Sequence, residues 1–184
     1  MPKIIFISGP CGCGKSSLTD AYARHLVNGD GKTRYVIHGD DFHAGFVETE
    51  NKGDFFVDGQ ASDTVHWEDI LRFNWDCILQ VAERALADNV DVLIDYVIET
   101  EMPLVKALAQ KTGAELYYIV LTASEEEIER RIHLRGDVDM IERAKFLKRE
   151  LEALPDNQGH FFDNTSVSPE ASVEAIDLEK FRVL

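Results

Sequence analysis

A glycine-rich stretch near the start of the chain reads Gly9-Pro10-Cys11-Gly12-Cys13-Gly14-Lys15-Ser16. It satisfies the spacing G-x-x-x-x-G-K-[ST] and directly follows the apolar run Ile4-Ile5-Phe6-Ile7. A helical pattern comes next, with side chains repeating at Leu18, Tyr22 and Leu26. A buried strand, a glycine loop and a helix in this order are the context in which this spacing binds phosphate, which a chance match in a turn would lack. The sequence therefore predicts a nucleoside-triphosphate site.

Each residue type in this stretch has a physical reason. Gly9, Gly12 and Gly14 let the backbone curl so that successive N–H groups point inward at phosphate oxygens. The helix that begins near Lys15 turns the positive end of its dipole toward the same anion. Lys15 is expected to reach the outer phosphates as a catalytic cation, and the Ser16 hydroxyl to ligate Mg²⁺. The predicted nucleotide-binding residues here are Gly9, Cys11, Gly12, Cys13, Gly14, Lys15, Ser16 and Ser17.

The composition limits the partners that we expect. With 184 residues, the range 1–184 fits a single domain with a full hydrophobic core. The formal net charge of −15 repels nucleic acid and anionic lipid, so neither is expected as a partner. No run approaches the length of a membrane span, and the N-terminal residues 1–3 lead straight into the first strand, so no signal peptide is expected.

The chain has three cysteines, Cys11, Cys13 and Cys77. The first two form a Cys-x-Cys pair inside the glycine loop, which invites a redox or metal interpretation. No second pair is present to complete a zinc site, so small-residue filler is the better interpretation. This cysteine usage fits a reducing, cytoplasmic location.

Strand and helix patterns alternate along the whole chain. The expected strands cover 4–7, 34–37, 92–94, 116–121 and 161–162. Expected helices follow the glycine loop, span 65–87, follow Glu101, open at the capping box of Ser124, use one face of 140–154 and start at Ser168. Alternation of this kind predicts an α/β domain whose parallel sheet is covered on both faces. Ligands of such sheets lie beyond the carboxyl ends of the strands.

Carboxylates occupy the predicted strand ends. The second strand ends at Asp40-Asp41 and the third at Asp95. Asp95 follows an apolar run and is expected to hold Mg²⁺, directly or through water. Asp41, or Asp40, is positioned to accept the proton of a substrate hydroxyl as a general base. The alternative is that Asp40 caps a turn and Asp95 caps a loop.

The stretch after Asp41 has no clear period up to about residue 63 and is rich in aromatic side chains. These aromatics either line a pocket for the phosphate acceptor or anchor a long loop to the core. Loops of this length inside compact domains are often functional, so we assign the acceptor-binding segment to about 42–67. The predicted acceptor-binding residues are Asp40, Asp41, Phe42, His43, Trp67 and Asp95.

An arginine cluster precedes Gly136 and consists of Arg130, Arg131 and Arg135. Arg131 and Arg135 are four residues apart, so they share one helix face. Two guanidinium groups before a hinge glycine suit a lid, about 131–145, that closes over phosphates and stabilises charge in the transition state. The alternative is ordinary pairing with acidic neighbours, such as Glu127 with Arg131.

With these motifs, the chain resembles the P-loop small-molecule kinases, among them nucleoside monophosphate, shikimate and gluconate kinases and chloramphenicol phosphotransferase. The similarity rests on the glycine loop, on His38-Gly39-Asp40-Asp41-Phe42, on Asp95 and on Arg131-x-x-x-Arg135. It implies a three-layer P-loop NTPase fold with a five-stranded parallel sheet of order 2-3-1-4-5, and it implies ATP and Mg²⁺. It also implies that the acceptor binds between the end of the second strand and the helices that follow.

The resemblance suggests further residue roles. Asp41, or Asp40, takes the place of the acidic base or acceptor ligand, and an arginine of the lid helix, Arg130 or Arg131, covers the adenine. The stretch Asp163-Asn164-Thr165-Ser166 resembles the loop that borders the adenine, which adds Asn164 and Thr165 to the nucleotide site.

One departure from the family bears on the acceptor. Between Asp41 and Asp95 the only arginines are Arg72 and Arg84, both within one helix. The arginine set that would grip an acceptor phosphate is therefore missing, which argues against a nucleoside monophosphate and favours a neutral, hydroxyl-bearing acceptor.

The leading functional hypothesis is ATP-dependent transfer of phosphate to a hydroxyl of a small metabolite, nucleoside or drug. The alternative is a regulatory P-loop ATPase or nucleotide-binding switch, which would hydrolyse ATP without any metabolite. A GTPase is disfavoured because no Asn-Lys-x-Asp motif occurs, and a nucleic-acid 5′-end kinase because of the acidic charge. Neither the identity of the acceptor nor the oligomeric state is encoded in a readable motif.

Overall fold

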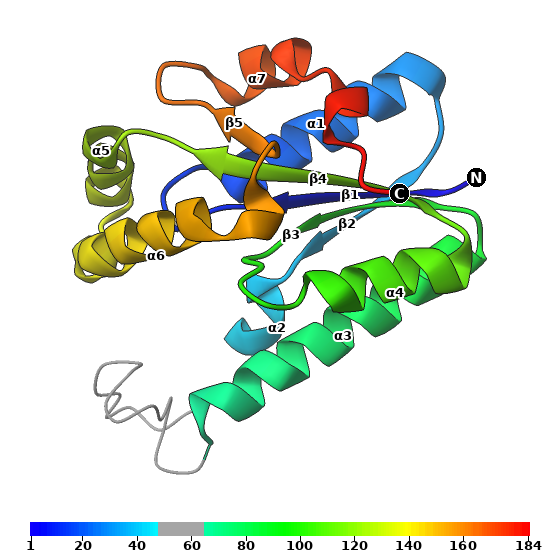
Figure 1. The fold of residues 1–184 in the computed structure, drawn as a ribbon, viewed down its shortest axis with the longest axis horizontal. Coiled ribbons are helices and arrows are strands. Elements are labelled where there is room, and N and C mark those ends of the chain that lie inside the picture. Colours follow the sequence, from blue (N-terminus) through cyan, green and yellow to red (C-terminus); the bar gives the residue numbers. More distant parts are fainter. Residues whose placement is uncertain (48–64) are drawn as a thin grey trace.

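The computed structural model describes residues 1–47 and 65–184. Within them, one five-stranded sheet has the order β2-β3-β1-β4-β5 (Figure 1). All neighbouring strands pair in parallel. The strands are β1 (Lys3–Ser8), β2 (Arg34–His38), β3 (Asp91–Asp95), β4 (Glu115–Thr122) and β5 (Phe161–Asp163). The predicted fold class and strand order are confirmed.

Helices cover both faces of this sheet. The α-helices are α1 (Lys15–Asp30), α2 (Asp40–Ala44), α3 (Trp67–Ala87), α4 (Met102–Thr112), α5 (Glu125–Arg135), α6 (Ile141–Ala153) and α7 (Pro169–Ala175). Short 3₁₀ turns are η1 (Val138–Met140), η2 (Pro155–Asn157) and η3 (Leu178–Phe181). Helices α1 and α7 cover one face and α3 and α4 the other, while α5 lies beyond the end of β4 with α6 beside it (Figure 1).

The two faces of the sheet build two separate apolar cores because successive strand residues point to opposite sides. Ile4 and Phe6 of β1 pack toward α3 and α4, in a core that includes Trp75. Ile5 and Ile7 pack toward α1 and α7 on the other side. Both faces are buried, as expected of a parallel sheet, so the polar side chains that can meet a ligand lie at the strand ends.

The strand registers bring three strand ends together. His38, the last residue of β2, is paired with Asp95 at the end of β3, and Ile7 of β1 is paired with the same Asp95. The glycine loop follows β1 directly. The carboxyl edge of the sheet therefore carries the phosphate loop, the Asp40-Asp41 pair and Asp95 side by side, as the sequence predicted.

The structure corrects some element predictions. Residues 40–44 form the short helix α2, where the sequence predicted a strand end at Asp40-Asp41 and an aperiodic stretch from about residue 42. Two aspartates in its first turn suit the positive end of the helix dipole. Helix α4 spans 11 residues, so it is longer than the short helix predicted after Glu101. Much of the acceptor segment 42–67, including Phe55 and Phe56, lies outside the described residues.

The outer edge of β4 is covered in two parts. Strand β5 pairs with its carboxyl half, at Val120–Thr122. The end of the chain covers the other half, where Arg182 forms an antiparallel bridge with Tyr117 and Leu184 accepts a hydrogen bond from the N–H of Leu116. The sequence patterns did not predict this returning segment.

Among residues 1–47 and 65–184, no helix combines the length and apolar character needed to cross a membrane. Cys11, Cys13 and Cys77 are all free thiols. Cys13 is fully buried in the glycine loop, and burial raises the pKa of its thiol above the usual value. These observations agree with the interpretation of the loop cysteines as small filler residues.

Candidate active site

The glycine loop between β1 and α1 has a backbone that requires glycine. Gly9, Gly12 and Gly14 have φ values of 143°, 76° and 91°, a region that residues with a Cβ rarely adopt. A Cβ on Gly9 would lie 2.6 Å from the carbonyl oxygen of Leu121, and a Cβ on Gly12 would lie 2.8 Å from Cγ1 of Ile132. The loop is therefore both curled and tightly enclosed, as a phosphate-gripping backbone must be.

Lys15 lies at the start of α1 with its side chain folded into the loop. Its Nζ donates a hydrogen bond to the carbonyl oxygen of Pro10 at 3.3 Å, and the residue is only 8% exposed. Burial by itself lowers the pKa of Lys15, but nearby acidic side chains outweigh it and raise the pKa above its usual value; in order of effect they are Cys13, Cys11, Asp40 and Asp95. Lys15 is therefore a buried cation inside the glycine loop.

Ser16, Asp95 and His38 form a hydrogen-bonded chain across the carboxyl edge. Ser16 Oγ donates to Asp95 Oδ1 at 2.8 Å, and the other carboxylate oxygen lies 2.5 Å from Nδ1 of His38. Burial opposes protonation of His38, yet its pKa is raised by Asp95 first and then by Asp20 and Asp41. The protonated form of His38 is thereby favoured beside the buried Asp95 side chain.

The pair Ser16 and Asp95 also fits Mg²⁺. A hydroxyl and a carboxylate are the hard oxygen ligands that this ion prefers, and Mg²⁺ usually keeps waters and phosphate oxygens as its other ligands. In the described part of the chain, no group of three or more His, Cys, Asp or Glu side chains is arranged to hold a metal by itself. The residues thus fit an ion that arrives with a phosphate ligand.

Asp40 and Asp41 lie in the first turn of α2, beside the loop. Both are exposed, and neither has a hydrogen bond or ion pair with another described residue. Their fields reach different partners, because Asp40 raises the pKa of Lys15 whereas Asp41 raises that of His38. Both carboxylates are therefore exposed at the carboxyl edge of the sheet, close enough to act on the charged groups of the loop and of β2.

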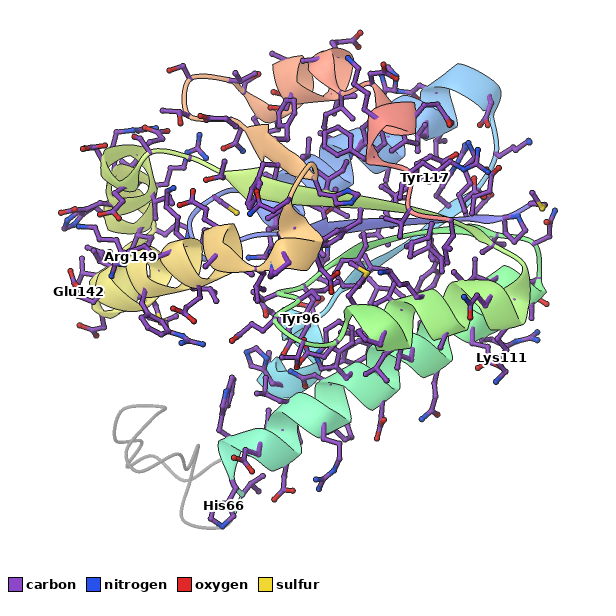
Figure 2. The ribbon with its side chains drawn as sticks, in the orientation of Figure 1. His66, Tyr96, Lys111, Tyr117, Glu142 and Arg149 are labelled. Atoms are coloured by element: carbon purple, nitrogen blue, oxygen red, sulfur yellow. The ribbon has the colours of Figure 1, made fainter. Side chains whose placement is uncertain are left out.

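The sequence did not predict the buried polar contact that Asn74 makes beneath α2. Asn74 of α3 is fully buried, and its Nδ2 donates to the hydroxyl of Tyr96 at 2.9 Å and lies 3.1 Å from Nδ1 of His43. Gly39 packs against the Tyr96 ring so closely that a Cβ there would lie 2.4 Å from it. Figure 2 shows Tyr96 at the end of the sheet beside α2.

A signal for this contact was present in the sequence. Asn74 is a polar residue on the apolar face of α3, between Leu71 and Ile78, and Tyr96 directly follows Asp95. Of the predicted acceptor residues, His43 joins this contact and stacks edge-on with Trp67 at 5.7 Å between ring centroids. Phe42 packs against the core, so at this position the anchoring alternative describes the structure.

Arg131 ties α5, the predicted lid helix, to the glycine loop and to the stretch after β5. Its Nη1 donates to the carbonyl oxygen of Cys13 at 3.0 Å and to Asn164 Oδ1 at 3.1 Å, and its Nη2 donates to the carbonyl oxygen of Asn164 at 2.8 Å. Asn164 Nδ2 donates to the same Cys13 oxygen at 2.8 Å. The glycine loop, α5 and the stretch after β5 are thereby fastened together.

The other lid arginines behave differently. Arg130 forms a bidentate pair with Glu127, which also accepts from Arg131, so the predicted alternative of acidic pairing is present in the structure. Arg135 pairs with Asp137 and is largely exposed. The structure thus brings Arg131, and not Arg135, to the phosphate loop.

A pocket of about 480 Å³ opens beside the loop and these arginines. Its lining combines the start of α1, the lid helix and the stretch after β5, and includes Gly14, Ser17, Arg130, Arg131, Asn164 and Thr165. Thr165 is fixed there, since its Oγ1 donates to Asp163 and accepts from the N–H of Ser124. These predicted nucleotide residues therefore surround one cavity.

Residues 5–154, which include the glycine loop and the lid helix, match the model of a family described as an AAA domain. The chain belongs to this AAA domain family. No curated protein matches this chain.

Solved structures with the same fold as this AAA domain include several kinases. An APS kinase of Mycobacterium tuberculosis in complex with AMPPNP and APS has a TM-score of 0.68 at 18% identity, covering 97% of this chain and 98% of that one. A sugar kinase of Janibacter has 0.61 at 16%, covering 98% and 96%. A gluconokinase of Sinorhizobium meliloti has 0.55 at 19%, covering 98% and 91%. The predicted resemblance to P-loop kinases holds for the fold.

Proposed function

We propose that this AAA domain is an ATP-dependent kinase that transfers the γ-phosphate of ATP to a hydroxyl group of a small molecule. The observation that carries the proposal is the hydrogen bond from Ser16 to Asp95 at the foot of the glycine loop, next to the exposed Asp40-Asp41 pair. A phosphate grip and available carboxylates on neighbouring strand ends are the parts that phosphoryl transfer to a hydroxyl needs. The shared fold with solved kinases adds support.

The nucleotide side supplies binding and charge stabilisation. The pocket beside Arg131 and Asn164 receives the base, and the loop amides with Lys15 bind the phosphates. Ser16 and Asp95 would hold Mg²⁺, which neutralises charge on the phosphate oxygens when bound. Because Lys15 is buried and cationic, its charge acts in a site of low dielectric, where it stabilises developing negative charge more strongly than in water.

In the transfer, the acceptor oxygen attacks the γ-phosphorus and a new O–P bond forms. The bond from this phosphorus to the oxygen that bridges the β- and γ-phosphates breaks, so ADP leaves with that electron pair. The hydroxyl proton passes to a carboxylate of α2, with Asp41 as the proposed base and Asp40 as its alternative. The products are ADP and a phosphate monoester, and the proton is released to water.

The test measures binding and turnover together. Calorimetry should detect Mg·ATP binding to the parent, and Lys15→Ala should weaken it at least about tenfold because the phosphates lose their buried cation. Lys111→Ala, which removes a surface partner of Glu83, is the matched control and should bind as the parent does. Absence of binding, or a Lys15→Ala variant identical to the parent, would refute the proposal.

A regulatory ATPase remains the competing function, and turnover separates it from a kinase. ATP consumption is followed with and without a pool of small alcohols. A kinase consumes ATP appreciably only when an acceptor is added, whereas a switch hydrolyses ATP at the same rate without one.

A further inference from the structure

The arginines in the lining of the 480 Å³ pocket beside the glycine loop are already bonded to protein groups. Arg131 uses four of its five N–H groups, because Nε donates to Glu127, Nη1 to the carbonyl oxygen of Cys13 and to Asn164 Oδ1, and Nη2 to the carbonyl oxygen of Asn164. Arg130 forms a bidentate pair with Glu127. The N–H groups of a guanidinium lie in its plane, so the surface that Arg131 offers a ligand is mainly its flat face.

Other polar side chains of this lining are also engaged. Asn164 accepts at Oδ1 and donates from Nδ2, so both ends of its amide are bonded. Thr165 Oγ1 donates one hydrogen bond and accepts another, and Ser168 Oγ caps the start of α7. Ser17 and Ser166 end in hydroxyl groups, which rotate to donate or to accept as a ligand requires. These side chains therefore present no fixed pattern of donors and acceptors to a base.

The backbone after β5 adds little to such a pattern. The N–H of Asn164 donates to the carbonyl oxygen of Thr122 at 2.9 Å, and the N–H of Thr165 donates to Asp163 Oδ1 at 2.8 Å. The N–H of Val167 donates to the carbonyl oxygen of Asn164 at 3.2 Å. The carbonyl oxygens of this stretch accept from N–H groups, and both adenine and guanine carry an amino group that donates. The backbone thus suits either purine.

We propose that this pocket binds the base by stacking on Arg131 and by apolar contact, and that the phosphate donor is a purine nucleoside triphosphate without strong preference between ATP and GTP. The inference rests on the proposed kinase function and widens its donor class. A site rejects the wrong base strongly only where a fixed polar group would lose its partner. Stacking does not discriminate in this way, because every base has a π face.

Apolar side chains complete the base contact. Leu18 is buried in the lining, and Val167 and Pro169 are half-buried there. Apolar contact stabilises a complex roughly in proportion to the area that it removes from water. A purine offers more of this area than a pyrimidine, so CTP and UTP are expected to bind more weakly than ATP and GTP.

Glu127 raises the alternative of a site that reads guanine alone, since a carboxylate can accept from the N–H groups of that base. Its oxygens already accept three hydrogen bonds, two from Arg130 and one from Arg131. A carboxylate has about four lone-pair directions, so little of this capacity is left for a ligand. Glu127 is thus a partner of the arginines, which favours the broader donor class.

The first test compares bases that differ in their polar groups. Calorimetry with the 184-residue chain measures Kd for the magnesium complexes of ATP, GTP and purine riboside triphosphate. The last compound has neither the 6-amino group of adenine nor the 6-oxo group of guanine. We expect the three Kd values to agree within about tenfold, because no fixed group loses a partner. A preference of more than tenfold for one of them overturns the inference.

The second test asks whether the base is bound at all. Magnesium tripolyphosphate has the phosphates without base or sugar, and it should bind at least about tenfold more weakly than Mg·ATP because the stacking and apolar contacts are lost. Equal binding of the two overturns the inference, since the base would then contribute nothing.

A variant of Arg131 separates stacking from a merely structural role. Arg131→Lys keeps the positive charge but removes the flat face. Mg·ATP and Mg·GTP should weaken equally, and their advantage over tripolyphosphate should fall at least about threefold. If Arg131 only holds the loop, all three ligands weaken alike and the advantage is unchanged, which overturns its role as the stacking surface. Lys111→Ala, which removes a surface partner of Glu83, is the control and should change no Kd.

The same measurements separate this inference from the proposed function. If neither Mg·ATP nor Mg·GTP binds the parent, the failure belongs to the proposed function. If Mg·ATP binds and Mg·GTP binds more than tenfold more weakly, the broad donor class is wrong and the kinase proposal stands.

Discussion

The proposed nucleotide side and the proposed acceptor side of this chain are built in opposite ways. On the nucleotide side, Arg131 and Asn164 bond to each other and to the carbonyl oxygen of Cys13, so the loop is held before any ligand arrives. On the proposed acceptor side, Asp40 and Asp41 have no hydrogen bond to another described residue, and Asn74 Oδ1 has no donor among residues 1–47 and 65–184. The region around the glycine loop is preorganised by its own hydrogen bonds. The region around Asp40 and Asp41 presents carboxylates without such bonds.

This difference suggests that the two regions have different tasks, phosphate binding in the first and substrate selection in the second. Preorganised donors cost no reorganisation during reaction, which suits the phosphate site, whose ligand is always the same. Groups without internal partners contribute only when the acceptor arrives, which suits the selection of one substrate among many. Changes on the acceptor side should therefore affect turnover, and changes on the nucleotide side should affect ATP binding and stability.

The largest effect is expected at the proposed base. Asp41→Asn should lower kcat by about 10²- to 10⁴-fold, because an amide cannot take the hydroxyl proton. The Kd for Mg·ATP should change less than about threefold, since Asp41 is not bonded to the loop. Steady-state kinetics with calorimetry measure both. Asp40→Asn is made in parallel, and if it alone abolishes turnover, the roles of the two aspartates are exchanged.

A large loss of stability is expected inside the loop. Gly12→Ala should destabilise the fold by about 3 kcal/mol, because the new Cβ meets Ile132 at 2.8 Å and the residue has a positive φ. Gly113→Ala has a positive φ but no heavy atom within 4 Å, so it should cost only about 1 kcal/mol. Urea unfolding compares the two. Equal losses would show that the loop is not tightly enclosed.

A smaller effect, on Mg·ATP binding, should distinguish Arg130 from Arg131 in α5. Arg131→Ala should weaken Mg·ATP binding about tenfold, because the loop carbonyl of Cys13 and Asn164 lose their shared donor. Arg130→Ala removes only an exposed pair with Glu127 and should weaken binding less than about threefold. If Arg130→Ala proves the more damaging by calorimetry, Arg130 rather than Arg131 covers the nucleotide.

The smallest expected effect is on the stability of the fold at acidic pH. Hydrogen bonding to Arg130 first, and then to Arg131, lowers the pKa of Glu127 to about 2 although burial opposes this. A folded-state pKa below the unfolded value near 4.3 contributes stability above about pH 4.5 that is lost as the pH falls toward 2. The melting temperature of the parent should thus exceed that of Glu127→Gln at pH 6, with a gap that narrows between about pH 5 and pH 3. A gap independent of pH would contradict this, and Glu150→Gln serves as the control.

Much of the framework could be predicted because it follows from local patterns. The motif around Lys15 occurs between a buried strand and a helix, and alternation of strands and helices implies parallel pairing with ligands at the carboxyl edge. The capping box at Ser124 was also read correctly, since its Oγ accepts from the N–H of Glu127. The order of strands came from the resemblance rather than from any single pattern.

The missed features depend on contacts between distant residues. Helix α2 is too short to be stable alone, and Gly39, which precedes it, packs closely on the ring of Tyr96 from the end of β3. The contact of Asn74 with Tyr96 joins a helix to a strand end, and no period in the sequence encodes it. Likewise, spacing places Arg131 and Arg135 on one face, but it does not reveal that a neighbouring Asp137 holds Arg135 away from the loop.

The returning end of the chain has a consequence far from the site. Without residues 182–184, the backbone N–H and C=O of Leu116, which now bond to this segment, would lose their partners and the β4 edge at Tyr117 would be uncovered. Unpaired strand edges promote self-association between molecules. Because residues 182–184 cover this edge, we expect that their removal reduces solubility.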